Sequence, residues 1–119
     1  MVCVGAAGGK RLAQRVEVED LAETTHDPLL ASLRQRLRKE HGAARQGRIG
    51  VRCVFSRESV AAPANACAVE GAEALALVDG SLNCHGYGSS VAVTATFGLV
   101  AAGEAISQLS TARPLQAFR

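Results

Sequence analysis

A glycine-rich segment near the amino terminus is the first candidate for chemistry. Residues 5–10 read GAAGGK and follow a short apolar run, which is where a phosphate-binding turn would stand. The spacing is not that of a dinucleotide-binding turn, because the second glycine comes three residues after the first, and Lys10 follows too short a spacer for a P-loop. We therefore favour a turn that ends a strand, where a backbone or a ligand can approach closely, over direct nucleotide contact.

A run of basic residues is the second candidate. Between positions 34 and 48, Glu40 is the only acidic residue among several cations. Such a cluster can grip a phosphate backbone through counterion release, although a solvated helix face has the same composition. No aromatic residue for base stacking lies in this stretch, which argues against single-strand binding by the run alone. The cations are Arg34, Arg36, Arg38, Lys39, Arg45 and Arg48.

Cysteine and acidic residues give weaker signals. Cys84, beside His85 in a small-residue loop before a helix, could be an activated thiol, but neighbouring side chains rarely face each other. The other cysteines suit a core, and the absence of any CxxC pair excludes a zinc ribbon and favours reduced thiols in the cytoplasm. Glu17 and Glu19 share a strand face without a third ligand, so we predict no metal site.

The elements that must position these residues are those of one domain, since the chain has 119 residues. Its net charge of +2 does not by itself imply a nucleic-acid partner. Alternating or apolar runs predict a buried strand within residues 1–9 and further strands at 15–20 and 50–55. Asp27 and Pro28 cap a predicted helix that ends near His41. A second helix is expected from about Val91 to Leu109, buried or interfacial, whose Gly98 would admit another backbone. Residues 72–78 could be strand or helix.

Five ordered segments then resemble one enzyme family. They are residues 4–10 (VGAAGGK), 16–22 (VEVEDLA), 27–37 (DPLLASLRQRL), 50–56 (GVRCVFS) and 93–98 (VTATFG). Together they resemble the C-terminal half of the tRNA threonylcarbamoyladenosine dehydratases, which are ThiF/MoeB-type adenylyltransferases related to ubiquitin-activating enzymes. The resemblance runs from residue 2 to about residue 110. It implies an α/β fold, the second half of a Rossmann-like domain, with a mixed sheet and two main helices.

The resemblance implies an ATP-dependent activity that needs more than this chain. The family adenylates the carboxylate of threonylcarbamoyladenosine beside the tRNA anticodon and then closes a ring. Its ATP and Mg²⁺ site lies on a strand, a GxGxxG turn and a helix that this sequence lacks. We therefore expect a partial domain at 1–110 with a tail at 111–119, inactive alone. The alternative is a non-catalytic remnant that binds RNA or a partner protein.

Some residues acquire roles through the resemblance. The turn with Gly5, Gly8, Gly9 and Lys10 matches a family segment that is structural or close to the substrate. Cys84 matches a cysteine discussed as a sulfur-handling thiol, which implies a sulfur-carrier partner. A homodimer is expected, and the last helix would pack on the sheet in preference to touching membrane. The residues implied to contact tRNA are Arg34, Arg36, Arg38, Lys39 and Arg48.

Overall fold

A small mixed sheet organises the part of the chain that the structure, a computed structural model, describes: residues 1–60 and 88–112. Strand β3 (Arg52–Ser56) lies in the centre, between β1 (Val2–Val4) and β2 (Val16–Asp20). β1 runs parallel to β3 and β2 runs antiparallel to it, so that Cys3 pairs with Cys53 and Val18 with Val54. Short 3-10 turns, η1 (Ala13–Arg15) and η2 (Leu21–Glu23), flank β2.

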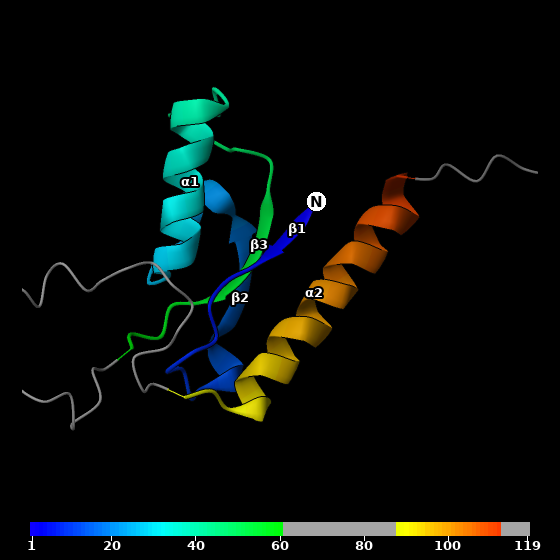
Figure 1. Cartoon of the computed structure of the whole chain (residues 1–119). Coiled ribbons are helices and arrows are strands. Elements are labelled where there is room, and N and C mark those ends of the chain that lie inside the picture. Colours follow the sequence, from blue (N-terminus) through cyan, green and yellow to red (C-terminus); the bar gives the residue numbers. More distant parts are fainter. Residues whose placement is uncertain (61–87, 113–119) are drawn as a thin grey trace, which may run out of the picture.

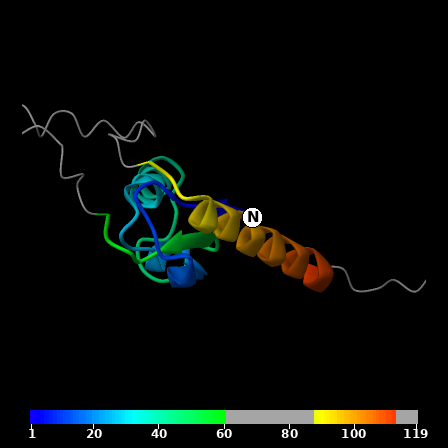
Figure 2. The same cartoon turned by 90° about the horizontal axis from the view of Figure 1, so that it is seen from below.

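A helix covers each face of this sheet (Figures 1 and 2). Helix α1 (Pro28–Glu40) closes one face around Cys53 and Phe55, with Leu30 as its buried contact. Helix α2 (Val91–Ala112) packs on the opposite face against Val54. Successive residues of β3 thus point into two separate cores, as the period of a strand requires. The expected α/β fold, with a mixed sheet and two main helices, is confirmed.

Helix α1 begins and ends where its sequence predicts. The Asp27 carboxylate accepts a hydrogen bond from the backbone N–H of Leu30, and Pro28 occupies the first turn. Past the carboxyl end, Gly42 has a φ of +63°, a conformation that glycine adopts without steric cost. Leu30 is buried in the core, whereas 37% of the surface of its neighbour Leu29 is exposed.

β1 is less buried than its sequence predicts. Val2 and Cys3 are half-buried and Val4 is 43% exposed, since β3 is its only paired strand among the described residues. The expectation of a buried strand is therefore wrong for this part of the chain, where β1 forms an edge. An edge strand leaves backbone N–H and C=O groups available for pairing.

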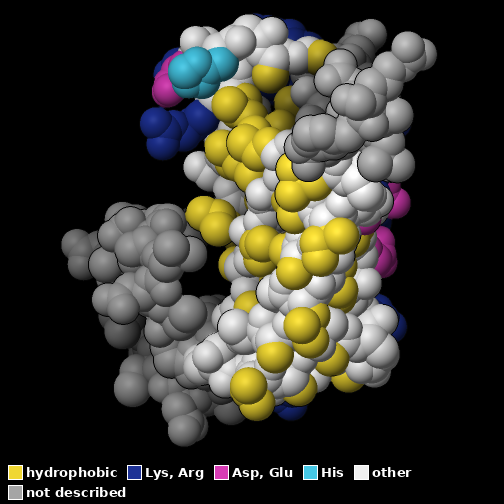
Figure 3. Space-filling view, turned by 90° about the vertical axis from the view of Figure 1, so that its right-hand side faces the viewer, with side chains coloured by type: hydrophobic (Ala, Val, Ile, Leu, Met, Phe, Trp, Pro, Cys, Tyr) yellow, Lys and Arg dark blue, Asp and Glu magenta, His cyan; other side chains and the backbone are white. Residues whose placement is uncertain are grey.

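Helix α2 is mostly exposed, so of its two expected placements, buried or interfacial, burial is wrong. Val93 and Phe97 are buried against the sheet, and Glu104 reaches back to an ion pair with Arg52 at 3.3 Å. Hydrophobic side chains spread over the face seen in Figure 3. The exposed ones on α2 are Val91 (81%), Leu99 (74%), Ile106 (67%) and Leu109 (72%).

The expected packing of α2 on the sheet is confirmed by the contacts of Val93 and Phe97 with Val54, and membrane contact stays a prediction. Its segment Val91–Thr111 has a mean hydropathy of 1.3 and is only 11% buried; by length and composition alone it could cross a membrane. No heavy atom lies within 4 Å of a Cβ placed on Gly98, so no other backbone approaches it among the described residues. The helix includes residues 111 and 112 of the predicted tail, and residues 113–119 lie outside the described part, as do residues 72–78.

Candidate functional site

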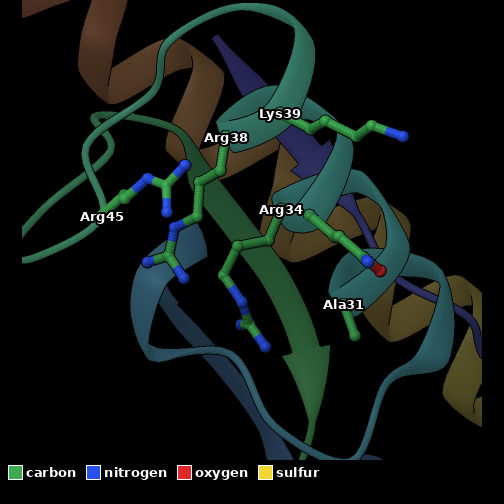
Figure 4. A pocket seen from close by; sticks show the side chains of 6 residues that line it. Ala31, Arg34, Arg38, Lys39 and Arg45 are labelled. Atoms are coloured by element: carbon green, nitrogen blue, oxygen red, sulfur yellow. The ribbon is translucent and has the colours of Figure 1, made fainter.

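A basic groove lies along α1, open to solvent and with a volume of about 780 Å³ (Figure 4). Arg34 and Arg38 extend from the helix on one side, Arg45 joins them from the following loop, and Lys39 points the other way. In the part of the chain that the structure describes, none of the residues lining it is acidic. The groove can therefore attract and hold an anion. Its lining residues are Ala31, Arg34, Gln35, Arg38, Lys39 and Arg45.

Two of the groove arginines are held by backbone oxygens. Arg34 Nη1 donates hydrogen bonds to the carbonyl oxygens of Leu21 (3.0 Å) and Thr24 (2.9 Å) and to the Thr24 hydroxyl (3.1 Å). Arg38 Nε donates to the carbonyl oxygen of Ala44 at 3.0 Å. A guanidinium has five N–H donors, so each arginine keeps donors for a ligand while its position is fixed.

The groove includes some of the predicted tRNA-contact residues and leaves out others. Arg36 lies on another side of α1, where it pairs with Glu40 at 3.7 Å. Arg48 is exposed and lies close enough to Asp20 to help lower the pKa of that carboxyl. Arg45 is absent from the predicted contact set although it lines the groove. Helical spacing could have separated Arg36 from Arg34 and Arg38, which stand four residues apart on one face.

Asp20 fixes the end of the loop that carries Arg45. Its carboxylate accepts hydrogen bonds from the backbone N–H groups of Ala22 (3.0 Å), Ile49 (2.8 Å) and Gly50 (2.7 Å). Burial on its own raises the pKa of Asp20, but these hydrogen bonds outweigh burial and hold the pKa below its usual value. The loop is thus anchored at Asp20 on one side and, through Arg38, at Ala44 on the other.

The predicted glycine-rich turn packs against its own chain. Gly9, with a φ of +74°, donates its N–H to the carbonyl oxygen of Gly88 at 3.0 Å, and the N–H of Lys10 closes the turn onto Ala7. A Cβ on Gly5 would overlap the Asp27 carboxylate, which accepts the N–H of Ala6 at 2.8 Å. These glycines are accounted for by close packing and left-handed backbone.

Lys10 is a buried tie between distant segments. It is 3% exposed, and Nζ donates to the carbonyl oxygens of His26 (3.1 Å), Ser56 (2.7 Å) and Glu58 (3.2 Å). Burial lowers the pKa of Lys10, and the nearby carboxylates of Asp27 and Glu58 oppose this only in part. All three hydrogen-bond donors of the ammonium are used within the chain. Lys10 therefore has a structural role in this arrangement, and the predicted contact of the turn with substrate stays a prediction.

The described residues do not fit a bound ATP–Mg²⁺. The turn's N–H groups at Gly9 and Lys10 are paired internally, and the amino terminus of α1 is already capped by the negative charge of Asp27. No group of three or more His, Cys, Asp or Glu residues in residues 1–60 and 88–112 could hold a metal ion. We therefore derive no step through ATP or magnesium from these residues.

The cysteines that the structure describes are core residues. Cys53 is fully buried, and burial raises the pKa of its thiol to about 12. Cys3 is half-buried and packs against the same core as Cys53. Both placements agree with the strand patterns. Cys84, the predicted reactive thiol, lies outside the described residues, as does its neighbour His85.

Comparison with known proteins gives a consistent set of relatives. No protein-family model matches the chain. The tRNA threonylcarbamoyladenosine dehydratase of Escherichia coli K12 is 38% identical over 112 residues, which cover 92% of this chain and 42% of the relative. The dehydratase of Haemophilus influenzae is 31% identical over 112 residues, 92% of this chain and 40% of the relative.

Solved structures agree with the sequence relatives. The E. coli tRNA N6-threonylcarbamoyladenosine dehydratase in complex with ATP has a TM-score of 0.71 and 34% identity, over 98% of this chain and 40% of that one. The same enzyme in complex with AMP has a TM-score of 0.68 and 35% identity, over 92% of this chain and 38% of that one. The chain is thus related in sequence and in fold to the tRNA threonylcarbamoyladenosine dehydratases, and it spans about two fifths of their length.

Proposed function

We propose that this chain is the C-terminal portion of an ATP-dependent tRNA threonylcarbamoyladenosine dehydratase and is inactive alone. The observation that carries the proposal is the match of 92% of the chain to such enzymes at 38% and 31% identity. The complexes of the E. coli enzyme with ATP and AMP support adenylation as the chemistry of the whole enzyme. The substrate would be the modified adenosine beside the tRNA anticodon, in the cytoplasm.

The reaction explains why the whole enzyme needs ATP. A free carboxylate is a poor electrophile, so the carboxylate of the modified adenosine attacks the α-phosphate and forms an acyl-adenylate with release of pyrophosphate. Intramolecular attack on the acyl carbon then closes the ring and expels AMP. Because the described residues do not fit ATP–Mg²⁺, we assign both steps to a site completed by the remaining part of the enzyme.

The test compares the 119-residue chain with a longer protein that adds a strand–GxGxxG–helix half before it. Both are incubated with ATP, Mg²⁺ and tRNA that carries threonylcarbamoyladenosine, and the nucleosides are analysed by mass spectrometry. We expect cyclic product from the longer protein and none from the chain alone. ATP–pyrophosphate exchange by the pure chain would contradict the absence of an ATP site, and a longer protein that binds ATP without cyclising would contradict the assigned reaction.

The basic groove favours one alternative, a non-catalytic remnant that binds RNA. Arg34, Arg38 and Arg45 lie together in it, and none of the described residues that line it is acidic. In that case the chain would bind tRNA, and adding the nucleotide-binding half would produce no cyclic product. The same experiment therefore separates the two functions.

The exposed apolar face of α2 supports a packing role in the assembled enzyme. The side chains of Leu99, Ile106 and Leu109 are mostly exposed to water, and an apolar patch of this kind usually marks an interaction surface. We infer that a second copy of the protein covers this face, which agrees with the expected homodimer. Light scattering should give a dimer mass that Leu99→Glu with Ile106→Glu reduces to a monomer. A sulfur-carrier partner, a thiol role for Cys84 and membrane contact remain predictions.

A further inference from the structure

We propose that the basic groove on α1 binds consecutive phosphodiesters of an RNA strand, with Arg34, Arg38 and Arg45 as its contacts. This inference rests on the proposed function, because it identifies where the tRNA backbone would meet this chain. It differs from the sequence-based contact set, since it adds Arg45 and leaves out Arg36 and Arg48.

The first support is the fixed position of the arginine side chains. Arg34 is held through a single nitrogen, Nη1, and Arg38 through Nε. Within the described residues, Nη2 of Arg34 and both terminal nitrogens of Arg38 have no hydrogen-bond partner. A ligand that binds these donors avoids most of the entropy cost of ordering two long side chains. Guanidinium donors in a fixed fork also match the paired oxygens of a phosphate.

The second support is the joining of helix and loop. Arg38 binds the carbonyl oxygen of Ala44, the residue before Arg45, so the same bond that fixes Arg38 also holds the loop beside the helix. Asp20 anchors the loop's other end through Ile49 and Gly50. These contacts place Arg45 next to Arg38 without involving the Arg45 guanidinium, so its charge stays available to a ligand.

The third support is the uncompensated charge of the groove. Arg36 is paired with Glu40, and Arg57 with Glu17 at 2.7 Å, but none of the described residues that line the groove is acidic. Among the described residues, Arg34, Arg38 and Arg45 form no ion pair. An anion at this site gains the attraction of several cations without displacing a carboxylate.

The shape of the groove favours an RNA strand over a nucleotide triphosphate. Its lining runs along α1 from Ala31 to Lys39, about 12 Å at 1.5 Å per residue, which is long enough for successive phosphates. A triphosphate site is usually a narrow cradle of backbone N–H groups at a glycine-rich turn or a helix amino terminus. This groove is open and lies on the side of a helix, with its cations on side chains.

The test measures binding of fluorescein-labelled tRNA to the 119-residue chain at salt concentrations from 50 to 300 mM. The groove variant is Arg38→Gln with Arg45→Gln. The matched control is Arg15→Gln with Arg36→Gln, which removes the same charge from exposed positions outside the groove. Circular dichroism verifies that both variants stay folded. Arg34 is left in place because its bonds to Leu21 and Thr24 support the fold.

Counterion release sets the expected size of the effect. Each lost phosphate contact lowers the slope of log K against log salt by about 0.7 to 0.9, so the groove variant should lose about 1.4 to 1.8. If the variant and the wild type bind tRNA equally at 1 M salt, the affinity of the variant at 0.1 M is about 25- to 60-fold lower than that of the wild type. In the control variant, the slope should fall by less than half as much as in the groove variant.

Three results would overturn the inference. They are equal losses in the groove and control variants, no tRNA binding by the wild-type chain at 50 mM salt, and full displacement of the tRNA by millimolar ATP. The cyclisation assay of the longer protein is independent of these results. If cyclisation fails while the groove variant alone loses tRNA, the groove inference stands and the dehydratase assignment falls.

Discussion

Replacing Lys10 by Met decides between a structural and a substrate-binding role for this lysine. In the structure its ammonium ties together the carbonyl oxygens of His26, Ser56 and Glu58, which come from distant parts of the chain. Met keeps the length of the aliphatic stem but cannot donate a hydrogen bond. We therefore expect Lys10→Met to destabilise the fold.

The magnitude follows from the exposure of the three carbonyl groups. The hydrogen bond to Ser56 is buried, so losing its donor costs about 1–3 kcal/mol. The bonds to His26 and Glu58 are partly buried, where water can replace the donor, and cost about 0.5–1 kcal/mol each. The sum is about 2–5 kcal/mol, which corresponds to a fall in Tm of roughly 8–20 °C for a chain of this size.

The assay is urea unfolding followed by far-ultraviolet circular dichroism, with Lys39→Met as the matched control. Lys39 undergoes the same chemical change on the exposed side of α1, and its free energy of unfolding should stay within about 0.5 kcal/mol of wild type. A Lys10→Met variant as stable as the control would refute the reasoning. If the longer enzyme carrying that variant also lost cyclisation, Lys10 would act on substrate instead.

Three further predictions concern packing, protonation and thiol reactivity. Gly5→Ala should lower the free energy of unfolding in urea by about 1–3 kcal/mol, because the new Cβ would lie 3.0 Å from Asp27 Cγ and 3.1 Å from Leu30 Cδ1. The control Gly98→Ala, which has open space around it, should be neutral or stabilising. Asp20→Asn should lower stability at pH 7, because the carboxylate that accepts three backbone N–H groups is lost. The difference in stability from wild type should narrow as the pH falls through the folded-state pKa of Asp20, which lies below its usual value; a difference that does not change with pH would contradict the assigned hydrogen bonds. Cys53 should resist iodoacetamide until the chain unfolds, because its thiol is buried and its pKa is about 12, whereas rapid labelling of Cys53 under native conditions, read by peptide mass spectrometry, would contradict the packing.

The sequence by itself determined the local elements. The bounds of α1 follow from Asp27, Pro28 and Gly42, because a helix cap and a terminating glycine act within a few residues of the chain. The alternation in residues 15–20 and 50–55 likewise predicts strands, since side-chain direction has a period of two. The five ordered segments, taken together, also indicate the family, because their order along the chain is far more specific than any one of them.

Tertiary structure decided which side chains are used and how. Lys10 meets carbonyl oxygens from residues 26, 56 and 58, and Arg45 reaches the groove through a bond between Arg38 and Ala44, so no local pattern could place either one. The exposure of α2 depends on how much of the helix the sheet covers, which the composition of the helix does not predict. Caps and periodicity are properties of neighbouring residues, whereas burial and charge pairing depend on segments that only folding brings together.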